Sequence, residues 1–104
     1  MHNLRVLIYT IALDAEGQTI QRTMAKILVS SLLRSYYTGD MLVLHNGNAP
    51  LFRVERKGVE EMMLRMPDGA DLMTEGCHLK YRARQWIPGG YDWVCFLDCD
   101  MIAL

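Results

Sequence analysis

Apolar residues form two kinds of pattern along the first half of this chain. From Leu4 to Ala12 they run almost without a break, which is typical of a parallel strand that is covered on both faces. Apolar residues then recur at helical spacing, with Thr19 as the expected N-cap and Gly39 as the expected stop. A second apolar run, Met41 to Leu44, ends at the turn-forming sequence Asn-Gly-Asn at 46–48. The order strand, helix, strand is the repeating unit of a parallel sheet.

The second half of the chain is predicted to continue this alternation. Leu51 to Glu55 is the candidate for a third strand, and Val59 to Met66 is the candidate for a short helix. From Thr74 to Ile87 the apolar positions form one helical stripe, which a Pro-Gly-Gly sequence terminates. A further apolar strand follows from Tyr91 to Leu97. We therefore expect an α/β fold, a Rossmann-like parallel sheet with helices on both faces, in a single domain over residues 1–104.

Composition narrows the functional classes. The 104 residues carry 11 Lys+Arg and 12 Asp+Glu, a formal net charge of -1, so bulk charge does not favour nucleic-acid binding. The first apolar run is far shorter than the roughly 20 residues of a membrane span, and we expect a cytoplasmic protein without one. The three cysteines cannot all pair and lack the spacing of zinc sites, so we expect reduced, structural thiols. Cys95 and Cys99 lie in or beside an apolar run and are expected to pack as small apolar side chains.

Two aspartates directly after the last apolar strand are the clearest candidates for chemistry. On an extended backbone, Asp98 and Asp100 point to the same side, while Cys99 points to the other. Two carboxylates held this close repel each other unless a cation lies between them. Mg²⁺ or Mn²⁺ takes one or two carboxylates and keeps positions for phosphate oxygens. The pair therefore predicts a metal site that holds a diphosphate.

The place of this pair in the chain also favours a binding site. In open parallel sheets, ligands bind at the carboxyl ends of the strands, where the strand order reverses. If the strand order is 3-2-1-4, the segment from Tyr9 to Asp14 lies beside Asp98 to Asp100, and one crevice receives both. The alternative interpretation is a pair of solvated acidic residues at a corner between strand and loop.

The segment from Lys80 to Asp100 resembles a known family. It combines a basic helix, a turn ending in Tyr-Asp, an apolar strand and a DxD motif followed by more apolar residues. This combination resembles nucleotide-sugar glycosyltransferases of the GT-A fold, above all the family-eight or glycogenin-like group. The strands at Val6 to Thr10 and Met41 to Leu44 fit the opening of that family. The resemblance thus covers essentially the whole chain, although only about the last 25 residues are distinctive.

The resemblance implies a metal-dependent hexosyltransferase. Such an enzyme moves a sugar from a nucleotide-diphosphate donor, here expected to be a UDP-hexose, to an acceptor that these residues do not identify. Asp98 and Asp100 would bind Mn²⁺ or Mg²⁺, and the donor diphosphate would be held at Asp98 through that ion. No catalytic residue for the transfer itself can be named from the sequence.

The resemblance also implies residues that contact the donor. Tyr9, Thr10 and Ile11, at the end of the first strand, would line the nucleoside pocket. Arg82 and Arg84 match basic positions that approach the donor phosphates or the sugar. The alternative for the arginines is that they are solvated charges near the end of a helix.

Two features separate the chain from a whole enzyme of this family. Such domains continue past the DxD motif with an acceptor-binding half and a late His or Asp that completes the metal site. In a 3-2-1-4 sheet, the apolar strand from Trp93 to Leu97 would also be an exposed edge. We therefore expect the donor-binding N-terminal half of a larger catalytic domain, inactive in isolation. The alternatives are a non-catalytic nucleotide- or metal-binding fragment and a DxD phosphatase of the haloacid-dehalogenase type.

Overall fold

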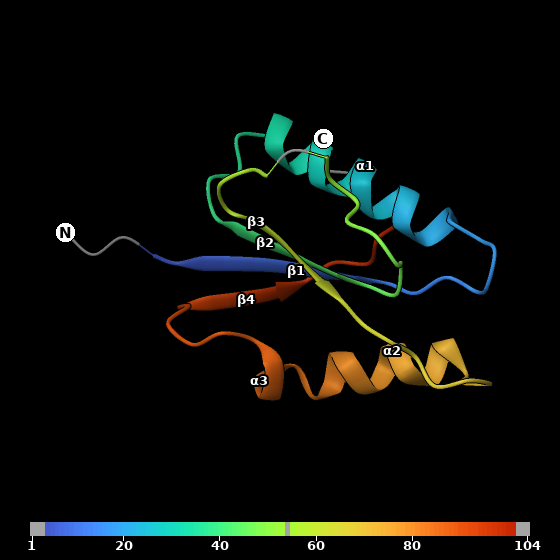
Figure 1. Cartoon of the computed structure of the whole chain (residues 1–104). Helices are drawn as coiled ribbons and strands as arrows, with labels where there is room; N and C mark the ends of the chain where they lie inside the picture. Colours follow the sequence, from blue (N-terminus) through green and yellow to red (C-terminus); the bar gives the residue numbers. More distant parts are fainter. Residues whose placement is uncertain (1–3, 54, 102–104) are drawn as a thin grey trace.

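The fold is a four-stranded parallel sheet between two helical layers (Figure 1). The computed structural model describes residues 4–53 and 55–101. The strands lie in the order β3-β2-β1-β4, and each neighbouring pair is parallel. This is the order 3-2-1-4 considered from the sequence, although a different segment forms the third strand. In chain order the elements are β1 (Val6–Ala12), α1 (Ile20–Arg34), β2 (Asp40–His45), β3 (Val59–Met63), α2 (Leu72–Tyr81), α3 (Ala83–Trp86) and β4 (Trp93–Phe96).

The sequence prediction was wrong about the third strand. Leu51 to Glu55 forms no strand where it is described, and Val54 lies outside the described residues. The expected helix from Val59 to Met66 begins instead with β3, which pairs with β2 along its whole length. The hydrogen bonds of β3 therefore come from a strand more than a dozen residues away, and such pairing overrides local propensity. The helix expected over 74–87 is likewise divided at Arg82 into α2 and α3.

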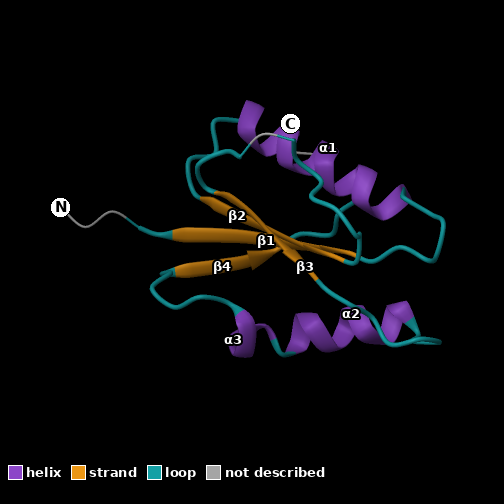
Figure 2. Cartoon of the chain, viewed as in Figure 1, coloured by secondary structure: helices purple, strands orange, loops and turns teal. Residues whose placement is uncertain are grey.

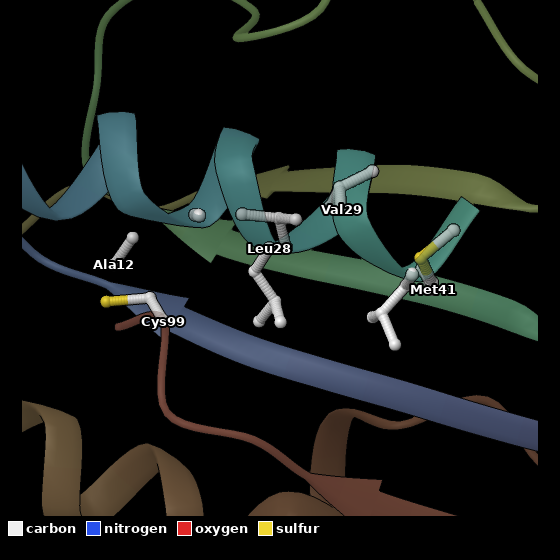
Figure 3. Close-up of a cluster of buried hydrophobic side chains, with 8 residues drawn as sticks. Ala12, Leu28, Val29, Met41 and Cys99 are labelled. Atoms are coloured by element: carbon white, nitrogen blue, oxygen red, sulfur yellow. The ribbon is translucent and has the colours of Figure 1, made fainter. Parts of the chain in front are cut away.

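Each face of the sheet has its own apolar core, because side chains alternate along the strands. Helix α1 covers one face and α2 with α3 covers the other (Figure 2). The α1 core, which is drawn in Figure 3, consists of Ala12, Ala25, Leu28, Val29, Leu32, Met41, Val43 and Cys99. The core on the other face is built on Leu7, Tyr9, Leu42 and Leu44, with partly buried side chains of α2, α3 and β4 packed against it.

The two helical layers differ in how closely they pack. Helix α1 contributes five buried residues, whereas α2 contributes none. The α2 layer therefore covers its face of the sheet more loosely than α1 does. No helix in the described part of the chain is long and apolar enough to cross a membrane.

The two edges of the sheet are protected to different degrees. On the β3 edge, Glu60 is exposed, and the Glu61 carboxylate holds the backbone of the preceding loop. On the β4 edge, Trp93 is 65 % exposed and Val94 is 43 % exposed, and Cys95 is exposed as well. An apolar strand with an unpaired edge is a template for pairing with another strand.

We expect the chain to self-associate through β4, and Trp93→Lys to reduce that association at least severalfold. The lysine would remove exposed apolar surface and place a charge on the strand edge, which disfavours edge-to-edge pairing. Sedimentation velocity over a range of concentrations measures the effect. Thr23→Lys, which adds the same charge at an exposed position of α1, is the matched control. A wild-type chain that stays monomeric at high concentration would contradict the prediction.

Candidate functional site

The carboxyl ends of β1 and β4 bring two distant segments of the chain together. The pairing of these strands continues past β4, because the Leu97 N–H donates to the Tyr9 carbonyl oxygen at 3.0 Å. Cys99 packs in the same core as Ala12, the last residue of β1. The segment that contains Asp98 and Asp100 therefore lies beside the end of β1, where the 3-2-1-4 order was expected to put it.

Asp98 and Asp100 lie in a turn and not on an extended strand. The Met101 N–H donates to the Asp98 carbonyl oxygen at 3.1 Å, which closes a four-residue turn that begins two residues after the end of β4. Both aspartates are exposed, whereas Cys99 between them is buried. The expectation of an extended backbone was thus wrong, although Cys99 does point away from solvent. The backbone turns here because strand pairing with β1 has ended.

The Cys99 thiol is held inside the α1 layer by a polar contact. It is 6 % exposed, and its Sγ donates to the Gln21 Oε1 at 2.9 Å. Burial raises the pKa of this thiol, and the negative charges of Asp100 and Asp98 raise it further. The thiol therefore remains protonated and can act as a hydrogen-bond donor. Cys77 and Cys95 are exposed, so the expectation of a packed thiol was wrong for Cys95.

Asp14 organises the start of α1. Its carboxylate accepts from the Gln21 N–H at 2.7 Å and from the Arg22 N–H at 3.1 Å. The Arg22 Nε lies 3.5 Å from the same carboxylate, whose side chain is only 1 % exposed. Thr19, the expected N-cap, makes no capping hydrogen bond with its side chain. Asp14 takes this role because the loop after β1 folds back over the first turn of the helix.

Asn46 connects the loops that follow β1 and β2. Its Oδ1 accepts from the Asp14 N–H at 2.9 Å, and its Nδ2 donates to the Asp14 carbonyl oxygen at 2.8 Å. This double hydrogen bond fixes the two loops against each other. The carboxyl edge of the sheet is therefore a connected hydrogen-bonded framework that runs from β2 through β1 and α1 to the turn after β4.

A hollow of about 840 Å³ opens at this edge, between the loops that follow β1, β2 and β3. Its volume lies in the range of small-molecule pockets. The Asp98–Met101 turn does not line it, but Arg22 does, and Arg22 is the neighbour of the Gln21 that binds Cys99. The polar lining includes Asp14, Glu16, Arg22, Asn46, Asn48 and Arg65.

The three residues expected to line a nucleoside pocket lie on different faces of the sheet. Tyr9 is 5 % exposed and packs against Trp86 and Phe96, with ring centroids 5.3 and 5.2 Å away. Ile11 packs in the same core as Tyr9. Thr10 is 2 % exposed beneath α1, and its hydroxyl has no hydrogen-bond partner among the described residues. These three side chains therefore do not line one common surface.

Tyr9 instead contributes to a second hollow, of about 640 Å³, beside β4 on the α2 side. Lys80 also lines it, and its ammonium group lies 4.6 Å from the centre of the Phe96 ring. Arg82 is exposed at the junction of α2 and α3, and it does not line this hollow. Arg84 lies in α3, and the structure does not describe its side chain.

Asp14, Gln21 and Asn46 were not singled out from the sequence. The sequence partly indicated Asn46, because it begins the Asn-Gly-Asn turn that follows an apolar strand. A residue just after a parallel strand lies at the carboxyl edge of the sheet, where ligands bind. Gln21 had no signal, because its partner Cys99 is 78 residues away. Only the folded structure shows that the segments containing Gln21 and Cys99 are in contact.

The donor set at the turn suits a hard divalent cation. The described residues include no group of three or more His, Cys, Asp or Glu side chains that could hold a metal ion. Asp98 and Asp100 are nevertheless both accessible, and Mg²⁺ and Mn²⁺ bind through one or two carboxylates together with water and phosphate oxygens. The two residues therefore fit an ion that is shared with a phosphorylated ligand.

Comparison of the chain with protein-family models, with curated proteins and with solved structures found no match.

Proposed function

We propose that this chain is the donor-binding part of a metal-dependent glycosyltransferase, acting on a nucleotide-diphosphate sugar such as a UDP-hexose. The observation that supports this most directly is the exposed pair Asp98 and Asp100 in the turn after β4, beside the end of β1. In an all-parallel sheet of order β3-β2-β1-β4, this is where the strand connections reverse direction and where ligands bind.

Asp98 and Asp100 would hold Mn²⁺ or Mg²⁺ together with the donor diphosphate. When bound, the ion would supply positive charge to stabilise the departing nucleoside diphosphate. The nucleoside would extend into the 840 Å³ hollow, whose wall includes Arg22, one residue after the Gln21 that contacts the turn. Asp14 and Asn46 keep the loops around this hollow in place through their mutual hydrogen bonds.

The buried positions of Tyr9, Thr10 and Ile11 change the details of this proposal. Their side chains pack in the two cores, so the loops after the strands would provide most of the contacts to the nucleoside. Tyr9 would act by supporting β4 through its contact with Phe96. Arg82 and Arg84 remain candidates for contacts to the donor phosphates or the sugar.

Titration with UDP in the presence and absence of Mn²⁺ tests the function. We expect UDP to bind with Mn²⁺ and to lose at least tenfold in affinity with a chelator, a difference of about 1.4 kcal/mol. Asp100→Asn should remove the metal dependence, because a neutral amide is a poor ligand for a hard cation. Glu60→Gln, which removes one exposed carboxylate on the β3 edge, should bind as the wild type does.

Other results of the same experiments would contradict the proposed function. Equal affinity of the wild type and Asp100→Asn, or binding that a chelator does not change, would exclude the assignment of Asp98 and Asp100. A covalent phosphate on Asp98 after incubation with a phosphorylated substrate would instead indicate the phosphatase alternative.

A further inference from the structure

The turn that carries the two aspartates has one side-chain anchor in the protein interior. Cys99 points into the α1 core and is 6 % exposed, close to Ala12 and α1 (Figure 3). Asp98 and Asp100, on either side of it, are exposed. Because the strand pairing of β4 ends before this turn, the Cys99 side chain is what packs the turn against the rest of the fold.

A hydrogen bond also holds the Cys99 side chain and fixes the direction in which its thiol points. The Cys99 Sγ donates to the Gln21 Oε1 at 2.9 Å, and the Gln21 N–H donates to the Asp14 carboxylate at 2.7 Å. Asp14 in turn is bound through its backbone to Asn46. The turn after β4 is thereby connected to the first turn of α1 and to the loops after β1 and β2.

We propose that Cys99 and Gln21 are positioning residues, which together set the orientation in which Asp98 and Asp100 present their carboxylates to a divalent cation. This inference rests on the proposed function, and it adds two residues outside the acidic pair. Two like charges two residues apart repel each other, so a free turn would let the carboxylates diverge. An anchored turn holds them closer together and lowers the ordering cost of binding the cation.

Direct measurement of Mn²⁺ affinity, without nucleotide, separates this role from catalysis. Cys99→Val keeps an apolar side chain of similar size but removes the donor, and Gln21→Met removes the acceptor. Each is expected to weaken Mn²⁺ binding by roughly tenfold, as for other residues that orient metal ligands. Because both lose the same contact, the double variant should be little weaker than either single variant. Cys99→Ser, which keeps a donor, should bind within about threefold of the wild type, a difference of roughly 0.6 kcal/mol.

A control variant and a measurement of folding separate an effect on Mn²⁺ binding from a loss of the folded structure. Cys95→Val changes an exposed thiol on β4 and should leave Mn²⁺ affinity unchanged. Thermal unfolding of each variant verifies that it folds.

Three results would overturn the proposal. If the wild type binds Mn²⁺ and Cys99→Val binds it equally well, the positioning role is wrong while the proposed function stands. If Cys99→Ser is as weak as Cys99→Val, the contact with Gln21 does not set the turn. If the wild type does not bind Mn²⁺ at all, the proposed function fails, and the positioning role fails with it.

Discussion

Glu61→Ala is expected to lower the free energy of unfolding by about 3 kcal/mol, because it leaves three N–H groups without their acceptor. The Glu61 carboxylate accepts from the His45 Nε2 at 2.9 Å, from the Leu51 N–H at 2.7 Å and from the Phe52 N–H at 3.3 Å. His45 is fully buried, at 0 % exposure, so the substitution removes the acceptor of a donor inside the fold. Urea denaturation followed by circular dichroism measures the change.

The hydrogen bonds of His45 also determine which ring nitrogen carries the proton. The Gly47 N–H donates to the His45 Nδ1 at 3.1 Å, so this nitrogen must be unprotonated. The Nε2 therefore carries the hydrogen and donates it to Glu61. This arrangement makes Glu61 the acceptor for a neutral imidazole, and it ties the loop between β2 and β3 to both strands.

Glu60→Ala is the matched control for Glu61→Ala. Glu60 is the preceding residue of β3 and is exposed, so its loss is expected to change the free energy of unfolding by no more than about 0.5 kcal/mol. A similar cost for both variants would mean that the three hydrogen bonds to Glu61 contribute little.

Asp14→Ala is expected to destabilise the fold by about 3 kcal/mol. It removes the acceptor for the Gln21 and Arg22 N–H groups at the start of α1, and it leaves the Arg22 guanidinium without its buried partner. Asp14→Asn retains one acceptor oxygen and should recover part of the loss. Chemical denaturation of the variants, compared with the loss of α1 hydrogen-exchange protection, measures the effect.

Thr19→Ala distinguishes the two candidate caps of α1. Thr19 occupies the N-cap position, but its side chain makes no capping hydrogen bond, so its replacement should cost no more than about 0.5 kcal/mol. A larger cost for Thr19→Ala than for Asp14→Ala would contradict the assignment of the cap to Asp14.

Most of the fold could be predicted from local patterns. The unbroken apolar runs of β1 and β2 and the helical spacing of α1 each reflect burial on defined faces, and the structure has these elements within a few residues of the prediction. The third strand could not be predicted in this way, because β3 contains the adjacent residues Glu60 and Glu61 and lacks a continuous apolar face. Its strand conformation depends on pairing with β2 and on the contact between Glu61 and His45.

The candidate site also combines features that the sequence predicts with features that only the folded structure shows. The sequence was sufficient to indicate Asp98 and Asp100, because a pair of acids after an apolar strand is visible in the residue order. It was not sufficient for the shape of that segment, which is a turn, nor for the burial of Tyr9, Thr10 and Ile11 in two separate cores. Those features depend on which helix covers which face.

The sequence by itself determined β1, α1 and β2 and the place of Asp98 and Asp100 just beyond β4, because these follow from residue types at close spacing. The tertiary structure decided the pairing of β3, the capping of α1 by Asp14 and the attachment of the turn through Cys99 to Gln21. The physical reason is the same in each case. A polar group that is buried on folding forms a hydrogen bond with a group that lies near it in the folded chain. That group is often distant in sequence.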